Sequence, residues 1–312
     1  MSAGGGTRAV LAALLANTGI AVTKFLAWLL TGSSAMLAES VHSVADAGNQ
    51  GLLLIGGARA RREATALHPF GYGRERYIYA FIVSIVLFSV GGLFALYEAW
   101  HKLSDPHAIT SWHWVPVVVL VVAIVMESFS LRTAVRESNA VRGRASWVSF
   151  VRRARAPELP VVLLEDIGAL LGLVFALIGV GLTLITGNGI WDAVGTAMIG
   201  LLLVAIAVVL AIETKSLLLG EAATGADQAA IEAALTAPGG PVDRVIHMKT
   251  MHLGPDELLV AAKISVPPQA TAAEVAETID AAEARIRAAV PIARVVYLEP
   301  DIYRSAAITG SG

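Results

Sequence analysis

The sequence predicts a membrane bundle of six transmembrane helices followed by a small α+β domain at the C-terminus. Of its 312 residues, 56% are hydrophobic and only 15% are charged, whereas soluble domains carry roughly 25% charged residues. Apolar stretches long enough to cross a bilayer recur through the first two thirds of the chain, and the pattern changes after Glu221. We therefore expect a transmembrane domain at 1–221 and a cytoplasmic domain at 222–312.

A helix needs about 20 apolar residues to cross the hydrocarbon core. Six stretches meet this length, at residues 9–30, 36–57, 78–100, 112–131, 159–185 and 190–212. The second is the least hydrophobic, because several polar side chains interrupt it. The chain is thus predicted to be a multi-pass integral membrane protein that contacts the lipid bilayer along most of its length.

Basic residues gather in two of the five connections between these spans. The connection after the second span holds Arg59, Arg61, Arg62, Arg74 and Arg76. The connection after the fourth holds Arg132, Arg136, Arg142, Arg144, Arg152, Arg153 and Arg155, and the other three hold only Lys102. Loops rich in Lys and Arg stay in the cytoplasm, so both of these loops and both termini are predicted to be cytoplasmic.

The C-terminal segment alternates between patterns typical of helices and strands. Residues 226–235 predict a short amphipathic helix, and 242–253 and 258–266 predict strands joined by a turn at Gly254-Pro255-Asp256. Thr271 and Glu274 form a capping-box pattern that opens a helix reaching Ala289. A last strand is expected at 293–298. The order α-β-β-α-β suits a small ferredoxin-like domain with its helices on one face of the sheet.

Four polar side chains share one face of the second span. Glu39, His42, Asp46 and Asn49 follow one another at offsets of three, four and three residues, which places them on one stripe of an α-helix. Charged groups inside a membrane are costly, and they usually face the bundle and serve a function. The imidazole of His42 and the carboxylate of Asp46 can supply half of a tetrahedral site for zinc or a related ion.

The fifth span adds two adjacent acids, Glu165 and Asp166, near its cytoplasmic third. Adjacent residues point about 100° apart on a helix, so we expect only one of the two to complete a metal site, with Asp166 favoured over Glu165. Gly168 and Gly172 lie four residues apart and would let another helix approach this face closely.

Three further polar residues are predicted to be structural. Lys24 in the first span would need an acidic partner, for which Glu39 and Glu127 are the candidates. Glu127 is expected to serve in such pairing rather than in a metal site. Asp192 at the start of the sixth span is predicted to cap that helix.

Composition and missing motifs exclude several function classes. The chain has no cysteine, so a metal site must use imidazole and oxygen ligands. The net charge of −2 argues against a nucleic-acid binder. No G-x-x-x-x-G-K-[ST], H-E-x-x-H or G-x-S-x-G motif is present, which disfavours an ATP-driven pump and the corresponding membrane enzymes. We therefore expect a protein that is not an enzyme.

Motifs along the chain resemble the cation diffusion facilitator family of divalent-cation efflux proteins, in a branch resembling zinc transporter nine. Residues 33–46 read SSAMLAESVHSVAD and are followed by Asn49, which resembles the family's second span. HPFGYG at 68–73 and LLED at 163–166 resemble its loop before span three and its fifth span. WD at 191–192, LLGE at 218–221 and EP at 299–300 also fit in order and spacing.

The resemblance implies a homodimer that exports Zn²⁺ or a similar divalent cation from the cytoplasm across the cell (inner) membrane, with protons as the counter-ion. The family's transport site takes two residues four apart in span two and two in span five. His42 and Asp46 match the first pair, and Asp166 matches one member of the second. Val162 stands where zinc members usually carry His or Asp. Glu165, Asn49 or water could supply the fourth ligand, and Tyr297 replaces a histidine of the family's cytoplasmic site.

Two questions stay open at this stage. Imidazole and carboxylate ligands suit zinc, and they also suit cobalt, iron(II), nickel and manganese. The alternative to a transporter is a non-transporting membrane partner or scaffold subunit of a metal-handling complex, because the incomplete pair in span five could reflect lost transport.

Overall fold

The computed structural model describes residues 18–106, 112–236 and 242–304. The chain divides into two compact units, one formed by Met1–Arg59 with Glu75–Lys215 and the other by Ala60–Arg74 with Ser216–Gly312. Residues 9–17 of the first predicted span lie outside the described ranges.

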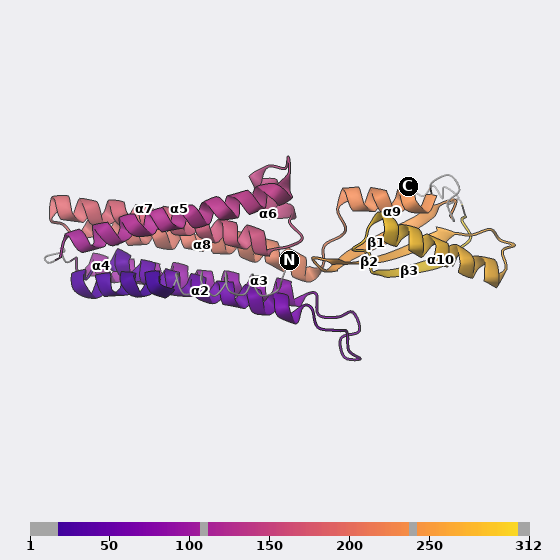
Figure 1. Cartoon of the computed structure of the whole chain (residues 1–312), viewed down its shortest axis with the longest axis horizontal. Coiled ribbons are helices and arrows are strands. Elements are labelled where there is room, and N and C mark those ends of the chain that lie inside the picture. The colour runs from indigo at the N-terminus through magenta and orange to yellow at the C-terminus, as the bar shows by residue number, and fades with distance from the viewer. Residues whose placement is uncertain (1–17, 107–111, 237–241, 305–312) are drawn as a thin grey trace, which may run out of the picture. The chain divides into compact units, whose positions relative to one another are not determined.

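The first unit is built of helices (Figure 1). A short apolar helix covers Thr18–Thr31. The helices that follow it in the chain are α2 (Ser34–Arg59), α3 (Glu75–Val86), the π-helix η1 (Leu87–Leu93), α4 (Phe94–Ser104), α5 (Trp114–Arg142), α6 (Trp147–Arg153), α7 (Glu158–Thr186) and α8 (Ile190–Leu219).

Four helices of the described chain are long and apolar enough to cross a membrane. They are the continuous run Glu75–Ser104, which joins α3, η1 and α4, and the helices Trp114–Arg142, Glu158–Thr186 and Ile190–Leu219. These correspond to the third to sixth predicted spans. The helix α2 has 26 residues but does not meet this criterion, because polar and charged side chains interrupt its apolar surface.

Two of these helices differ from the sequence-based expectation. The fourth span was predicted to end at Leu131, but α5 continues to Arg142 and ends before Gly143, whose φ is 56°. Residues 132–142 contain neither Gly nor Pro, so nothing in that stretch stops a helix once it has started. The third span contains the seven-residue π-helix η1, which hydrophobic periodicity did not predict.

The helices pack around a common apolar core to which α2, η1, α5, α7 and α8 each contribute. Its fully buried side chains include Met36, Leu87, Leu120, Leu173 and Leu203. Small residues bring the helices close together. A Cβ atom on Gly168 would lie 2.7 Å from Ile206 Cδ1 of α8, and one on Gly172 would lie 2.8 Å from Glu39 Oε1 of α2. The prediction that these two glycines allow a close approach is confirmed.

The second unit follows the predicted order α-β-β-α-β. Its elements are α9 (Gly225–Thr236), β1 (Val245–Gly254), β2 (Glu257–Ser265), α10 (Ala272–Ala289) and β3 (Val295–Asp301). The sheet order is β1-β2-β3, with β1 and β2 antiparallel and β2 and β3 parallel. Side chains of α9, α10 and β2 share one core, which includes Ile231, Ile286, Leu258 and Ile264.

A capping box formed by Thr271 and Glu274 marks the start of α10. The Thr271 side chain accepts from the Glu274 backbone N–H and the Glu274 side chain accepts from the Thr271 backbone N–H, so the predicted capping box is confirmed.

The segment Ala60–Arg74 also packs within this unit. A Cβ atom on Gly73 would lie 2.8 Å from the Leu253 carbonyl oxygen, so only glycine fits there without a shift of the backbone.

Candidate metal-binding site

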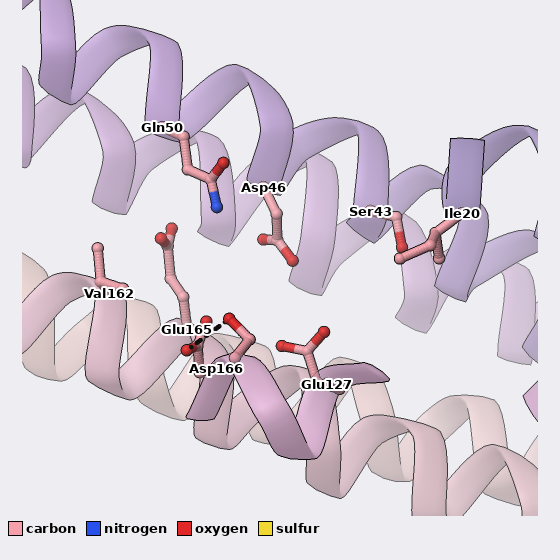
Figure 2. A pocket seen from close by; sticks show the side chains of 9 residues that line it. Ile20, Ser43, Asp46, Gln50, Glu127, Val162, Glu165 and Asp166 are labelled. Atoms are coloured by element: carbon pink, nitrogen blue, oxygen red, sulfur yellow. Dashed lines mark hydrogen bonds between the residues drawn. The ribbon is translucent and has the colours of Figure 1, made fainter. Parts of the chain in front are cut away.

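A small polar pocket lies inside the first unit, between the helix Thr18–Thr31, α2, α5 and α7. Its volume is about 30 Å³, which is on the scale of a single water molecule. The lining residues are Ile20, Ser43, Asp46, Gln50, Glu127, Ser130, Val162, Glu165 and Asp166. Figure 2 shows Asp46 and Gln50 extending from one side of the pocket toward Glu165, Asp166 and Glu127 on the other.

The helix α2 supplies Asp46, as the polar stripe predicts. Its side chain is 19% exposed, and Oδ2 lies 3.4 Å from His42 Nε2. The other oxygen, Oδ1, is buried and has no hydrogen-bond partner. The imidazole of His42 is also buried, and neither of its ring nitrogens makes a hydrogen bond. Unsatisfied buried polar atoms of this kind are costly, so this part of α2 holds polar groups whose hydrogen-bonding capacity is unused.

The helix α7 supplies two acids that are held by different neighbours. Asn49 Nδ2 of α2 donates to Glu165 Oε1 at 2.7 Å, and Ser130 Oγ of α5 donates to Asp166 Oδ2 at 3.1 Å (Figure 2 marks the second bond with a dashed line). Both acids are buried and both line the pocket. Both acids border the same pocket although adjacent residues point about 100° apart on a helix. That only one of the two completes a metal site stays a prediction.

Asn49 and His42 do not line the pocket themselves. Asn49 is fully buried and orients Glu165. A Cβ atom on Gly91 of η1 would lie 3.8 Å from His42 Nδ1, so the imidazole borders the π-helix. Of the five residues predicted for the site, the structure brings three into the pocket and places the other two directly behind them.

Glu127 was predicted to be structural, and the structure places it in the pocket wall. Its spacing from Ser130 is three residues, which puts both on one face of α5 and is the signal that could have identified it. Ser43 and Gln50 of α2 were also missed. They flank Asp46 at offsets of three and four residues, the same spacing that identified the polar stripe.

A buried ion pair adjoins the pocket. Lys24 Nζ lies 3.0 Å from Glu39 Oε2 and donates to Ser43 Oγ at 2.8 Å. Both charged side chains are almost completely buried. Of the two acidic partners considered for Lys24, the structure therefore selects Glu39, and Ser43 connects the pair to the pocket wall.

Asp192 does not cap α8, so that prediction is wrong. Its carboxylate accepts hydrogen bonds from Ser33 and Ser34, at the start of α2. The side chain of Asn188 accepts from the Ile190 backbone N–H at the start of α8 instead. Asp192 and the pocket acids therefore have different neighbours and are considered separately below.

The pocket is rich in oxygen ligands but they are not gathered into a closed shell. Within residues 18–106, 112–236 and 242–304, no three His, Asp or Glu side chains are close enough together to hold a metal ion. Val162 lines the pocket one helical turn before Asp166 and offers no ligand atom. The carboxylates that line this water-sized space, and the imidazole of His42 beside Asp46, are nevertheless ligand types that divalent metals take in proteins.

The apolar helices and the buried polar face of α2 define a helical membrane protein with charged side chains inside its bundle. The model of the cation efflux transmembrane domain matches residues 10–219, which is most of the chain. The chain therefore belongs to the cation efflux family, and it is a multi-pass membrane protein.

Three relatives illustrate the range of similarity. The chain is 36% identical over 199 residues to the human "Proton-coupled zinc antiporter SLC30A9, mitochondrial", a match that covers 63% of this chain and 35% of that protein. It is 29% identical over 263 residues to "Metal tolerance protein C4" of Arabidopsis thaliana, covering 82% and 56%. "Zinc transporter ZitB" of Pectobacterium atrosepticum matches at 29% over 119 residues, covering 38% and 36%. The chain thus spans about a third of the length of its human relative.

Proposed function

We propose that this chain is a secondary transporter that moves divalent metal cations, with Zn²⁺ as the main substrate, through the pocket between α2, α5 and α7. The observation that carries the proposal is the convergence of Asp46, Glu127, Glu165 and Asp166 from three helices. Such acids are costly in a membrane and mark ion pathways. No catalytic motif competes with this interpretation, so we expect transport rather than an enzymatic reaction.

Asp46, Glu165 and Asp166 are the proposed metal ligands, together with His42. The orphan nitrogens of His42 and the orphan Asp46 Oδ1 are ready to bind an ion once it enters. Asn49 already donates to Glu165, so its role is to orient that ligand, while its unpaired Oδ1 remains a candidate contact. Imidazole and carboxylate ligands favour zinc, and cobalt, iron(II), nickel and manganese are alternative substrates.

Protons are the proposed counter-ion. Four carboxyl groups around one small space cannot all carry a negative charge unless a cation or bound protons offset the repulsion. An entering metal ion displaces the protons, because its ligands must be deprotonated. Protons from the opposite side of the membrane then release the ion. The human relative is named a proton-coupled zinc antiporter, which agrees with this scheme.

The proposed topology has six spans, with α2 and the helix Thr18–Thr31 added to the four apolar helices. Polar side chains lower the hydropathy of α2, which is why hydropathy alone does not select it, and Glu39, His42 and Asn49 among them are buried inside the bundle. The arginine-rich connections support cytoplasmic termini, a cytoplasmic ferredoxin-like domain at 222–312 and residence in the cell (inner) membrane. Family resemblance supports a homodimer.

One observation favours a second candidate function. Val162 leaves the ligand set of α7 incomplete, which is compatible with a non-transporting partner or scaffold subunit. The two candidates differ in whether the purified chain moves metal by itself.

The test is uptake of zinc and of manganese into proteoliposomes under an imposed pH gradient, comparing the natural chain with Asp46→Ala. Zinc flux that follows the gradient and disappears in the variant supports the exchanger. Equal flux in the variant would refute the site. A natural chain that stays folded and dimeric but moves neither ion would favour the partner-subunit function.

A further inference from the structure

Asp192 forms a fully satisfied polar cluster at the end of the membrane unit where α2 and α8 begin. One oxygen accepts from Ser33 Oγ at 2.8 Å, and the other accepts from the Ser34 backbone N–H at 2.8 Å and from Ser34 Oγ at 3.1 Å. Thr196 Oγ1 lies 3.0 Å from Ser34 Oγ. All four residues are completely buried.

The cluster caps one helix with a carboxylate that belongs to another. Ser34 is the first residue of α2, and its backbone N–H is one of the donors that a helix leaves unpaired at its start. A negative charge at this position also interacts favourably with the helix dipole. The bond therefore joins the first turn of α8 to the first turn of α2, across 158 residues of sequence.

Two further contacts join helices at the same end of the unit, where α2 and α8 begin. Lys102 Nζ of α4 donates to the Gly32 carbonyl oxygen at 3.2 Å, just before α2 begins. A Cβ atom on Gly179 of α7 would lie 2.8 Å from the Trp191 carbonyl oxygen and 3.2 Å from Gly195 Cα of α8. Backbones this close leave no passage between α7 and α8 at this level.

The pocket lies further along the same helix. Asp46 follows Ser34 by 12 residues, which is about 18 Å along the axis of α2. Any motion that tilts α2 away from α8 at its start also moves Asp46 and His42, because a helix transmits such a motion as a rigid body.

We propose that the Asp192 cluster is a latch: Asp192 is a positioning residue that holds the start of α2 against α8, and the latch must open before the pocket can reach the face of the membrane on which α8 begins. The inference rests on the proposed transport function in one respect. In a transport cycle, the closed latch belongs to the state in which the pocket is closed to this face of the membrane, and the open latch to the state in which it is accessible from there. In the present structure the latch is closed.

The first test measures access to the pocket and does not depend on metal flux. The chain has no cysteine, so Ile20→Cys places a single thiol at the pocket wall. A thiol reagent that cannot cross the bilayer is applied to the face on which α8 begins. Asp192→Asn should raise the labelling rate about tenfold, because an amide nitrogen cannot accept the bonds that the second oxygen receives.

The control is Glu98→Gln, which replaces a half-buried acid of α4 by its amide at the same end of the unit and should leave labelling unchanged. Labelling that is equal in Asp192→Asn and in its parent overturns the latch. If Asp192→Asn fails to fold, Thr196→Val takes its place, since it removes only the outer hydroxyl of the cluster. The same rise of smaller size is then expected, and no rise again overturns the proposal.

The second test locks the latch. Ser34→Cys together with Thr196→Cys places two sulfur atoms where two hydroxyl oxygens lie 3.0 Å apart. Oxidation should reduce zinc flux into proteoliposomes at least about tenfold, and a reductant should restore it, with zinc binding unchanged. Equal flux in the oxidised and reduced forms overturns the proposal. If the reduced protein and the natural chain both fail to move zinc, the transport function fails, and the labelling test alone decides the latch.

Discussion

Buried carboxylates occur in two regions of the membrane unit, and their hydrogen bonding differs. At the start of α8, both oxygens of Asp192 are occupied by donors from α2. In the pocket, Asp46 Oδ1 has no hydrogen-bond partner, Asn49 donates to Glu165, and Ser130 donates to Asp166. The same residue type is therefore a structural cap in one region and a set of open acceptors in the other.

The difference follows from what each region must hold. A carboxylate whose acceptors are filled by fixed N–H and O–H groups stabilises one arrangement of helices. A buried carboxylate with open acceptors destabilises the empty state, which fits the proposal that a cation or a proton binds there. Asp192 and the pocket acids are all largely buried, so burial alone does not distinguish them, whereas their hydrogen-bond donors do.

The largest expected effect comes from neutralising one acid of each kind. Glu165→Gln should reduce zinc flux about 100-fold while thermal stability stays the same or rises, since an amide replaces one of four neighbouring carboxyl groups. Asp192→Asn should instead destabilise the fold by about 2 kcal/mol, because buried donors lose their acceptor. Flux in proteoliposomes and thermal unfolding in detergent measure the two effects. Glu213→Gln, on α8 beside Arg152, is the control. If Glu165→Gln and Asp192→Asn have the same effects on flux and on stability, the two acids do not differ in role.

A second prediction concerns the space beside the pocket. Gly172→Val should destabilise the protein by about 2 kcal/mol, because its side chain would overlap Glu39, which lies 2.8 Å from the Cβ position and is held by Lys24. Gly181→Val is the matched control on the same helix, since nothing lies within 4 Å of its Cβ position. Thermal unfolding of the two variants decides the point. Equal stability would mean that the Lys24–Glu39 pair can move at little cost.

A third prediction completes the ligand set of α7. Val162→His adds an imidazole one turn before Asp166, and we expect zinc affinity to rise about tenfold. Leu164→His, about 200° around the helix from Val162, should leave affinity unchanged. Calorimetric titration of zinc compares the two variants. If Val162→His does not change the zinc affinity, metal does not bind at this level of α7.

The smallest effect lies in the second unit, where no metal role is proposed. Thr271→Ala removes the cap of α10 and should cost about 1 kcal/mol, seen as faster hydrogen exchange of the first-turn amides in the full chain. Thr278→Ala, in the middle of the same helix, is the control. Zinc flux should not change in either variant, and a loss of flux would indicate that this unit takes part in transport.

The same cap predicts a pH dependence. Hydrogen bonds from the backbone and side chain of Thr271 lower the pKa of Glu274. A lowered pKa in the folded state means that the contribution of this group is present above its unfolded pKa and is lost as the pH falls through the folded value. The difference in exchange between the natural chain and Thr271→Ala should therefore shrink on acidification.

Much of the fold and part of the site could be predicted from local patterns. Hydrophobic runs identified the apolar helices, and the capping box identified α10, because both signals lie within a few residues of each other. The polar stripe of α2 led to Asp46 and His42, since helical periodicity determines which residues share a face. The acids of α7 were found because charge in an apolar run is rare.

The roles of isolated acids could not be predicted from local patterns. Glu127 and Asp192 are single acids, and their roles depend on partners in other helices. Ser130, one turn after Glu127, meets Asp166 across 36 residues, and Asp192 meets Ser34 across 158. The sequence pattern assigned Asp192 to a cap of its own helix, which is wrong, and it offered Glu127 as a partner of Lys24, whereas Lys24 pairs with Glu39.

The sequence by itself determined that the chain spans a membrane, which face of α2 is polar and where the α-β-β-α-β unit lies, since these properties depend on local periodicity and composition. Only the tertiary structure decided which carboxylates meet. That outcome depends on how far each helix is rotated and shifted against its neighbours, which the close glycine contacts and the packed core establish. The same local pattern of buried acids therefore became an open pocket in one region and a closed cap in the other.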